Sequence, residues 1–416
     1  MSSDVEFVED GDQFFERLWE MIDSSKTCCW ILTYHMVDNF IATETLKRLM
    51  RAAERGVSVV LFVDWLNFWV NMDLVQELRY KGGVVVALNP MNFFMRYAGR
   101  QRIFSKEIFE RYHQKLFLID EQVIIGTANL DCEYAGAKHG TGNFYDLNLL
   151  IKGKLIAEAQ SIFHNIAARY KIPLKVPKLP ETPTPTLEML LAEPNYMRYD
   201  IQEKALSMLA SAKTRILLLH GYYFYIPKVI KALQEAVNRG VQVELYTSRS
   251  RDQPCYTHMP NSWLTQEARD VGVKVYEYPQ SVLHMKAYIV DDHFLIGSFN
   301  NDKWSWGMNN ELNIFNSDPE LTKELVKKVE LVRRRSLEVK DEELTWKQRF
   351  FIYIWWAFLE TSERVMDRRK WMKENFQEAY IQAPGETTES RFLRKRKARK
   401  RLFQEAKSFI TLGLLG

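Results

Sequence analysis

Hydrophobic residues follow the same succession of spacings in two distant parts of the chain. In residues 46–63, apolar residues three or four apart lead to Gly56 and then to a β-branched run. Residues 230–246 repeat this order around Gly240. Spacing of this kind predicts an amphipathic helix that ends at the glycine, followed by a strand.

A second pair of matching segments lies further along each part. Residues 83–90 begin with Gly-Val-Val-Val and residues 272–279 with Gly-Val-Lys-Val, and both segments end in proline. The repeat predicts two similar halves. Because strands alternate with helices, we expect βαβ units and a mainly parallel sheet in each half.

Proline density marks the border between the halves. Five prolines occur between Ile172 and Leu187, which is too many for a helix or a central strand, so we expect an extended linker. The expected division is a first half at 1–172, a linker at 173–190, a second half at 191–340 and a helical, basic tail at 341–416.

Composition excludes several classes of protein. The 416 residues are 46% hydrophobic and 26% charged, which excludes a mainly disordered or collagen-like chain. Four cysteines without a CxxC pair predict neither a disulfide framework nor a zinc site. The first 23 residues are acidic, unlike a targeting leader, and no apolar run reaches the ~18 residues of a spanning helix.

Each half contains the same polar motif. The spacing His-x-Lys-x4-Asp-x5-Gly-[Ser/Thr]-x-Asn occurs at His113, Lys115, Asp120, Gly126, Thr127 and Asn129, and again at His284, Lys286, Asp291, Gly297, Ser298 and Asn300. A single His-x-Lys pair is commonly a surface accident. Two identical sets in register with an independent repeat are not, so this motif is expected to perform the chemistry.

Strand periodicity brings the polar groups of each motif together. Residues two apart on a strand share a face, so His113 is expected beside Lys115, and the second motif follows the same rule. The hydroxyl and amide residues at the end of each motif share a face for the same reason. The aspartates fall at expected turns between paired strands. If the halves pack about a pseudo-twofold axis, both sets converge on one pocket.

Such a pocket suits a phosphate group. Two lysines and two pairs of hydroxyl and amide groups would form a cradle through charge-assisted hydrogen bonds. The phosphate-binding candidates are Thr127, Asn129, Ser298 and Asn300. One histidine can attack phosphorus, the other can protonate the leaving oxygen, and a carboxylate behind a histidine would fix its tautomer. Because the lysines supply positive charge and no carboxylate cluster indicates a metal, we expect neither metal nor cofactor.

The doubled motif resembles the signature of the phospholipase D superfamily, and its surroundings resemble bacterial-type cardiolipin synthases. Residues 297–302 with Ser305 and 309–311 are similar to the GSxNxDxRSxxxNxE pattern of those synthases, and residues 223–227 to their TPYFxP. The resemblance covers roughly residues 10–360. It implies an α/β fold, a duplicated α/β/α sandwich whose two pseudo-symmetric halves share one active site, followed by a C-terminal helical tail.

The resemblance also implies roles for particular residues. It implies a phosphohistidine mechanism in which His113 is the nucleophile and His284 the acid. Asp146 and Glu311 become the carboxylates that orient the histidines. The motif aspartates belong to the catalytic signature, but in that family they act mainly in structure.

The expected function is phosphatidyl transfer that forms cardiolipin from phosphatidylglycerol or a close phospholipid donor. A phospholipase D or another phosphodiesterase, including a nuclease, is the alternative, because only the acceptor differs. The Asn-x-Glu and Tyr-Phe-Tyr-Ile-Pro segments favour the synthase, and no groove-reading motif indicates nucleic acid. Two intact motifs disfavour a non-enzymatic lipid-binding module.

Three segments indicate peripheral contact with a membrane. Bases alternate with aromatic residues in 92–112, Trp346–Val365 is aromatic but too short to span, and eight Lys or Arg residues lie between Arg391 and Arg401. These features suit an anionic surface, either the cytoplasmic face of a bacterial inner membrane or the mitochondrial inner membrane. A solvated charged helix or a helix packed on the catalytic halves explains the same patterns, and the oligomeric state stays open.

A further aromatic group follows Asp64. Trp65, Phe68 and Trp69 fit either the lining of an acyl groove or ordinary core. The sequence does not decide between these two interpretations.

Overall fold

The computed structural model of the chain describes residues 4–9, 11–90, 110–142, 144–174, 186–249, 261–340 and 346. The chain divides into two compact units, Met1–Glu342 and Glu343–Gly416. All elements named below belong to the first unit, which contains both halves of the repeat. The predictions for residues 92–109, for 347–365, for the proline-rich segment 175–185 and for the basic tail lie outside the described residues.

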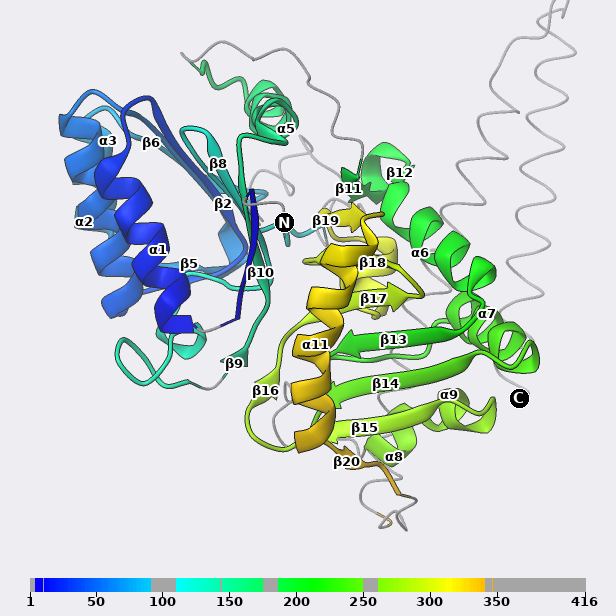
Figure 1. Cartoon of the computed structure of the whole chain (residues 1–416). Helices are drawn as coiled ribbons and strands as arrows, with labels where there is room; N and C mark the ends of the chain where they lie inside the picture. The colour runs from blue at the N-terminus through cyan, green and yellow to red at the C-terminus, as the bar shows by residue number, and fades with distance from the viewer. Residues whose placement is uncertain are drawn as a thin grey trace, which may run out of the picture. The chain divides into compact units, whose positions relative to one another are not determined.

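The described part of the first half contains a seven-stranded sheet in the order β1-β10-β8-β7-β2-β4-β6. Its strands are β1 (Val5–Val8), β2 (Cys28–Thr33), β4 (Ser58–Asp64), β6 (Val84–Leu88), β7 (Leu116–Ile119), β8 (Gln122–Gly126) and β10 (Asn148–Lys152). Helices α1 (Gly11–Ser24), α2 (Phe40–Glu54) and α3 (Met72–Tyr80) lie on one face, and α5 (Ile156–Arg169) lies on the other (Figure 1). Alternation along β2 explains this, because Cys29 and Ile31 pack with the first group and Trp30 and Leu32 with α5.

The described part of the second half contains a nine-stranded sheet in the order β12-β11-β19-β18-β17-β13-β14-β15-β20. Its strands are β11 (Leu187–Glu193), β12 (Arg198–Tyr199), β13 (Arg215–His220), β14 (Gln242–Ser248), β15 (Lys274–Tyr278), β17 (Lys286–Val290), β18 (His293–Gly297), β19 (Glu311–Asn316) and β20 (Leu337–Glu338). Helices α6 (Asp200–Ser211), α7 (Pro227–Asn238) and α9 (Gln266–Asp270) pack on one face, and α11 (Pro319–Arg335) packs on the other.

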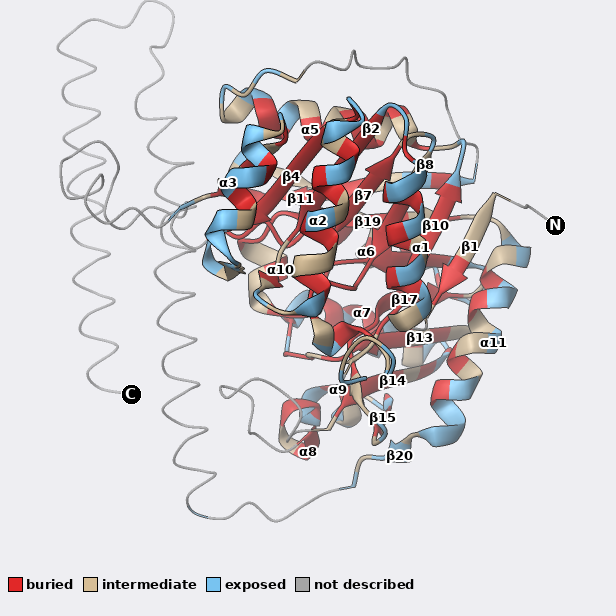
Figure 2. Ribbon diagram, turned by 90° about the vertical axis from the view of Figure 1, so that its left-hand side faces the viewer, coloured by how far each residue is buried: buried red, intermediate tan, exposed pale blue. Residues whose placement is uncertain are grey.

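Short elements complete the described chain. They are β3 (Met36–Val37), β5 (Phe68–Trp69), β9 (Phe144–Tyr145), β16 (Val282–Leu283), α8 (Asn261–Leu264), α10 (Lys303–Gly307) and the 3-10 turns η1 (Trp65–Asn67), η3 (Cys132–Tyr134) and η4 (Pro194–Tyr196). The central strands of both large sheets are mostly buried, while the helices keep exposed outer faces (Figure 2). The duplicated sandwich expected from the sequence is therefore confirmed.

The expectation of mainly parallel sheets is wrong. Parallel pairing is confined to β2-β4-β6 in the first large sheet and to β13-β14-β15 in the second, and every other pair in these two sheets is antiparallel. The motif strands β7 and β8, like β17 and β18, are joined by two residues. A connection this short permits only antiparallel pairing, because parallel strands need a crossover. The second half also starts earlier than expected, since β11 begins at Leu187, inside the range 173–190 assigned to the linker.

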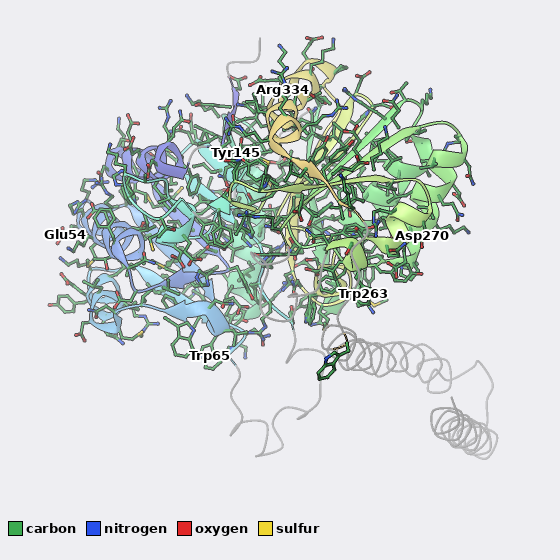
Figure 3. All side chains as sticks on the ribbon, turned by 90° about the horizontal axis from the view of Figure 1, so that it is seen from below. Glu54, Trp65, Tyr145, Trp263, Asp270 and Arg334 are labelled. Atoms are coloured by element: carbon green, nitrogen blue, oxygen red, sulfur yellow. The ribbon has the colours of Figure 1, made fainter. Side chains whose placement is uncertain are left out.

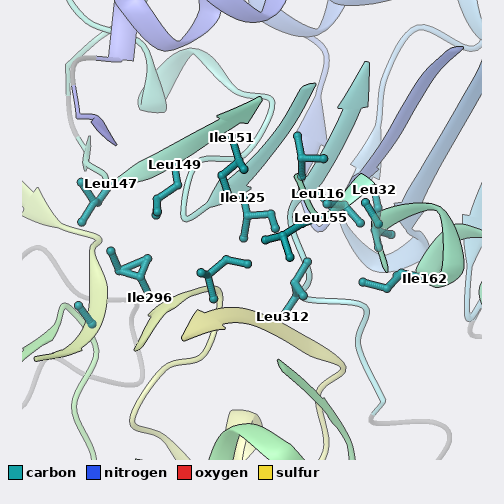
Figure 4. Packing of buried hydrophobic residues seen from close by; sticks show 14 of the residues in the cluster. Leu32, Leu116, Ile125, Leu147, Leu149, Ile151, Leu155, Ile162, Ile296 and Leu312 are labelled. Carbon is teal, nitrogen blue, oxygen red and sulfur yellow. The ribbon is translucent and has the colours of Figure 1, made fainter. Parts of the chain in front are cut away.

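The inner faces of the two sheets share one hydrophobic core. Leu116, Ile125 and Leu149 of the first sheet belong to the same buried cluster as Ile296 and Leu312 of the second (Figure 4). Fully burying one such side chain contributes roughly 1.5–3 kcal/mol. The shared core thus fixes the two halves against each other, as a single active site between them requires.

The motif aspartates hold the turns that end β7 and β17. Asp120 and Asp291 have left-handed backbone angles, φ 48° and 51°, which aspartate tolerates better than most residues. The carboxylates accept N–H groups at 2.8–3.0 Å from the start of the neighbouring strand, namely Lys26, Thr27 and Cys28 for the first and Lys213, Thr214 and Arg215 for the second. These contacts support the structural role that the sequence resemblance implies.

Replacing Asp291 by alanine is expected to destabilise the protein in a pH-dependent manner. Burial opposes ionisation, but hydrogen bonds from Thr214, Arg215 and Lys213 lower the pKa of Asp291 to about 2. Its contribution is therefore complete above its ordinary pKa and disappears as the pH falls towards 2. Urea unfolding at pH 7 should show a loss of about 1 kcal/mol or more for Asp291→Ala.

The exposed neighbour Asp292 provides the control. Asp292→Ala should unfold like the wild type at pH 7. An Asp291→Ala deficit that stays the same from pH 7 to pH 3, or one no larger than that of Asp292→Ala, would contradict this account of the turn.

Candidate active site

The two motif histidines lie where the halves meet, and each backbone pairs with the opposite half. The His113 N–H donates to the carbonyl of Asn310, and the His284 N–H donates to that of Tyr145, both at 2.9 Å. Tyr145 lies at this junction in Figure 3. Two further backbone contacts join the halves here, namely the parallel pairing of β16 with β9 and the bridge between Tyr112 and Asn310. The halves are therefore interlocked beside both motifs.

Each histidine ring is held by a carboxylate from the other half. His113 Nδ1 lies 3.0 and 2.9 Å from the two carboxylate oxygens of Glu311. His284 Nδ1 lies 2.7 Å from Asp146 Oδ1. All four side chains are buried. Because each carboxylate accepts the proton of Nδ1, Nε2 of each ring is the nitrogen available for chemistry.

The motif lysines lie beside the histidines, although His113 and Lys115 precede β7 and His284 precedes β17, so the strand on which the prediction relied begins later than expected. Lys115 Nζ donates to the carbonyl of His113 at 2.8 Å, and Lys286 Nζ donates to that of His284 at 2.5 Å. Both lysines are at most 1% exposed. Burial lowers the pKa of Lys115 to about 7 and that of Lys286 well below its usual value, partly offset by the nearby carboxylates.

The motif hydroxyls are engaged in a way that the sequence analysis did not anticipate. Ser298 donates to Glu311 Oε2, and Thr127 donates to the carbonyl of Leu147, beside Asp146. Both were expected to bind phosphate. Their hydroxyl protons are engaged within the protein, so phosphate binding by these two side chains stays a prediction.

Each motif amide has one oxygen whose hydrogen-bonding capacity the described residues leave unused. Asn129 Oδ1 and Asn300 Oδ1 are buried without a hydrogen-bond partner among the described residues. Rotation about χ2 would bring the Nδ2 donor to the same point, where a phosphate oxygen could accept it. A buried amide with an unmet bond is costly, and a bound oxyanion would relieve this cost. Phosphate binding by the two asparagines stays a prediction that these unpaired atoms favour.

Glu311 is more completely hydrogen-bonded than Asp146. Oε1 of Glu311 accepts from Ser305 at 2.7 Å and from Asn309 at 3.3 Å, in addition to the contacts given above. Asp146 Oδ2, by contrast, is buried and lacks a hydrogen-bond partner within the described part of the chain. Burial alone would raise the pKa of either carboxyl, but the neighbouring histidine and lysine keep both ionised.

Aromatic rings line both histidines. The Tyr34 ring lies 4.6 Å from that of His113, and Tyr134 and Phe144 each lie 5.2 Å from His284, between ring centroids. Sequence reasoning missed these three residues. One signal could have identified Tyr34. It directly follows β2, and β2 pairs with β7, the strand of the first motif.

Both histidines are neutral at pH 7 in the structure. Burial lowers the pKa of His113 to about 4 and that of His284 to about 3, and the nearby lysines act in the same direction. The carboxylates oppose this effect only in part. A neutral ring is nucleophilic at Nε2, whereas a ring that protonates a leaving group must first gain a proton.

Comparison with known proteins agrees with this geometry. Residues 18–167 and 205–332 match the family described as cardiolipin synthase, PLD-like domain. The minor cardiolipin synthase ClsB of Bacillus subtilis is 27% identical over 354 residues, which cover 83% of this chain and 86% of that protein. A cardiolipin synthase of Geobacillus kaustophilus is also 27% identical, over 76% of this chain and 63% of its own length.

A solved structure supports the fold. The crystal structure of phosphatidylserine synthase from Haemophilus influenzae has a TM-score of 0.69 and 14% identity, covering 88% of this chain and 95% of that one. By its match over residues 18–167 and 205–332, the chain belongs to the family described as cardiolipin synthase, PLD-like domain, within the phospholipase D superfamily.

Binding of an oxyanion to this site is expected to take up a proton. A negative charge about 4 Å from a ring contributes about 4 kcal/mol at an effective dielectric constant of 20. This is enough to bring protonation of a histidine into the neutral range. Calorimetry with tungstate at pH 6.5, in two buffers of different ionisation enthalpy, should report net proton uptake.

The variant His284→Ala separates the possible acceptors of this proton. It should bind tungstate with less proton uptake, whereas His293→Ala, at an exposed histidine on β18, should behave as wild type. Equal heats in both buffers, or undiminished uptake by His284→Ala, would show that His284 does not gain the proton.

Proposed function

We propose that this protein is a phosphatidyltransferase that forms cardiolipin from phosphatidylglycerol or a close phospholipid donor. The observation that carries the proposal is the crossed pair of dyads, His113 with Glu311 and His284 with Asp146. Each dyad presents one Nε2 atom in a site that also contains two buried lysines. The names of the Bacillus and Geobacillus relatives supply the lipid.

In the first step, His113 Nε2 attacks the phosphorus of phosphatidylglycerol. The bond from phosphorus to the headgroup oxygen breaks, and protonated His284 gives its Nε2 proton to that oxygen, so glycerol leaves. The phosphatidyl group is then bound covalently to His113. Glu311, held by Ser298 and Ser305, fixes the ring and stabilises the positive charge that it acquires.

In the second step, a hydroxyl of another phosphatidylglycerol replaces the histidine. His284 takes the hydroxyl proton at Nε2, the oxygen attacks phosphorus, and the phosphorus–nitrogen bond breaks. Two molecules of phosphatidylglycerol thus give one cardiolipin and one glycerol, and both histidines return to their initial states. Asp146 stabilises His284 in its charged form, which exists before the first step and again after the second.

The positive charge for both transition states is assigned to Lys115 and Lys286. Donors arranged in advance in a buried site stabilise developing charge more strongly than donors in water. Asn129 and Asn300 complete the cradle around the phosphate oxygens. Asp120 and Asp291 keep the structural role described above.

Membrane association follows from the proposed substrate, because both lipids reside in a bilayer. No helix among the described residues is long and apolar enough to span a membrane. The proposed location is peripheral, at the cytoplasmic face of a bacterial inner membrane or at the mitochondrial inner membrane. The basic run at Arg391–Arg401 would favour an anionic surface.

Product analysis tests the proposal. Purified protein incubated with phosphatidylglycerol vesicles should produce cardiolipin and glycerol in excess of phosphatidic acid, as measured by mass spectrometry. Added glycerol should slow net synthesis by reversing the first step. His113→Ala should abolish both products, while His293→Ala should retain them.

The alternatives give different products. Phosphatidic acid as the main product, unaffected by added alcohols, would make the protein a hydrolase. Cleavage of oligonucleotides without any turnover of lipid would identify a nuclease and contradict the proposal.

A further inference from the structure

The loop that follows β4 exposes a group of large apolar side chains. The exposed fractions are 38% for Trp65, 39% for Leu66, 67% for Trp69 and 49% for Met72. None of the eight residues from 65 to 72 is charged. Trp65 lies at the surface of the first half in Figure 3. These exposures exclude the interpretation of Trp65 and Trp69 as ordinary core, and exposed apolar groups of this kind mark contact surfaces.

The loop is held in a defined conformation by its own hydrogen bonds. Asp64 Oδ1 accepts the N–H of Leu66 at 3.0 Å, and the indole N–H of Trp69 donates to the carbonyl of Leu66 at 2.8 Å. The carbonyl of Trp69 accepts the N–H of Asp38 at 2.6 Å, next to the pairing of β3 with β5. The loop can therefore enter an apolar medium without leaving the Trp69 indole N–H unpaired and with little loss of conformational entropy.

The loop is also joined to the active site. Asp64 Oδ2 accepts the N–H of Tyr112 at 2.9 Å, directly before His113. Asp64 Oδ1 also accepts a hydrogen bond from the Arg111 guanidinium at 3.1 Å, two residues before His113. The loop thus begins directly after a residue that binds the segment carrying His113.

We propose that residues 65–72 form a docking loop whose apolar side chains insert into the interface of a lipid bilayer. The inference rests on the proposed function, since a lipid substrate must pass from the bilayer to His113. Tryptophan settles at the level of lipid headgroups. The loop carries no acidic side chain that an anionic lipid would repel. Its attachment through Asp64 to the backbone next to His113 brings the inserted side chains towards the lipid that supplies the scissile phosphate.

Vesicle binding tests the docking loop. The probe is vesicles of phosphatidylglycerol and phosphatidylcholine in 0.5 M NaCl, where most attraction between exposed charges is screened. The variant Trp65→Ser with Trp69→Ser should lower the partition coefficient about tenfold or more. The matched control is Tyr80→Ser, which removes a 92% exposed aromatic ring from the end of α3, outside the loop, and should leave binding unchanged.

A comparison of substrates separates docking from catalysis. The double variant should lose at least fivefold more turnover on vesicles than on monomeric short-chain phosphatidylglycerol. Wild-type partitioning by the double variant would overturn the docking loop even if cardiolipin is made. Sedimentation gives a second way to overturn the docking loop. If the wild type is a dimer, the double variant is a monomer and both bind vesicles equally, the loop contacts a second copy of the chain instead of a bilayer.

Failure of the proposed function gives a different result. If neither lipid form is turned over, but vesicle binding still depends on Trp65 and Trp69, the docking loop is supported and the phosphatidyltransferase is not.

Discussion

The hydrogen bond between each motif histidine and a carboxylate of the opposite half is the interaction on which the site depends. Neither half contains a complete dyad, because Glu311 orients His113 and Asp146 orients His284. Burying such carboxylates costs several kcal/mol each unless they are paired and hydrogen-bonded. The shared core and the crossed backbone pairs at Asn310 and Tyr145 keep the halves in the register that this pairing requires.

The two dyads are similar in position but not in their surroundings. Glu311 accepts hydrogen bonds from three polar side chains besides His113, whereas Asp146 Oδ2 lacks a partner among the described residues. A carboxylate with fewer hydrogen bonds is the stronger base. This difference suits the proposed division of work, in which His113 holds the covalent intermediate and His284 exchanges protons.

Much of the site follows from the sequence, because its spacing repeats. Strand periodicity predicted that His113 and Lys115 lie together, and the turn at Asp120 followed from its place between two apolar runs. The direction of strand pairing did not follow, since local periodicity is the same for parallel and antiparallel strands. The partners of the histidines lie 198 and 138 residues away, so spacing within the motif carried no information about them, and only the family resemblance indicated them.

The contacts of the motif hydroxyls could not be predicted for a similar reason. Ser298 donates to Glu311 at the start of β19, and the spacing within the motif gives no sign of this contact. The apolar loop at 65–72 was ambiguous because exposure depends on what packs against a segment, and an apolar run reads the same in a core and at a surface.

Mapping the covalent intermediate tests the shared site most directly. Protein quenched in acid-free denaturant during turnover of short-chain phosphatidylglycerol should carry one phosphatidyl group per chain, located by mass spectrometry on the peptide that contains His113. Glu311→Gln should reduce this labelling, although Glu311 belongs to the other half. Two groups per chain, labelling of His284 as often as His113, or labelling independent of Glu311 would contradict a single site assembled from both halves.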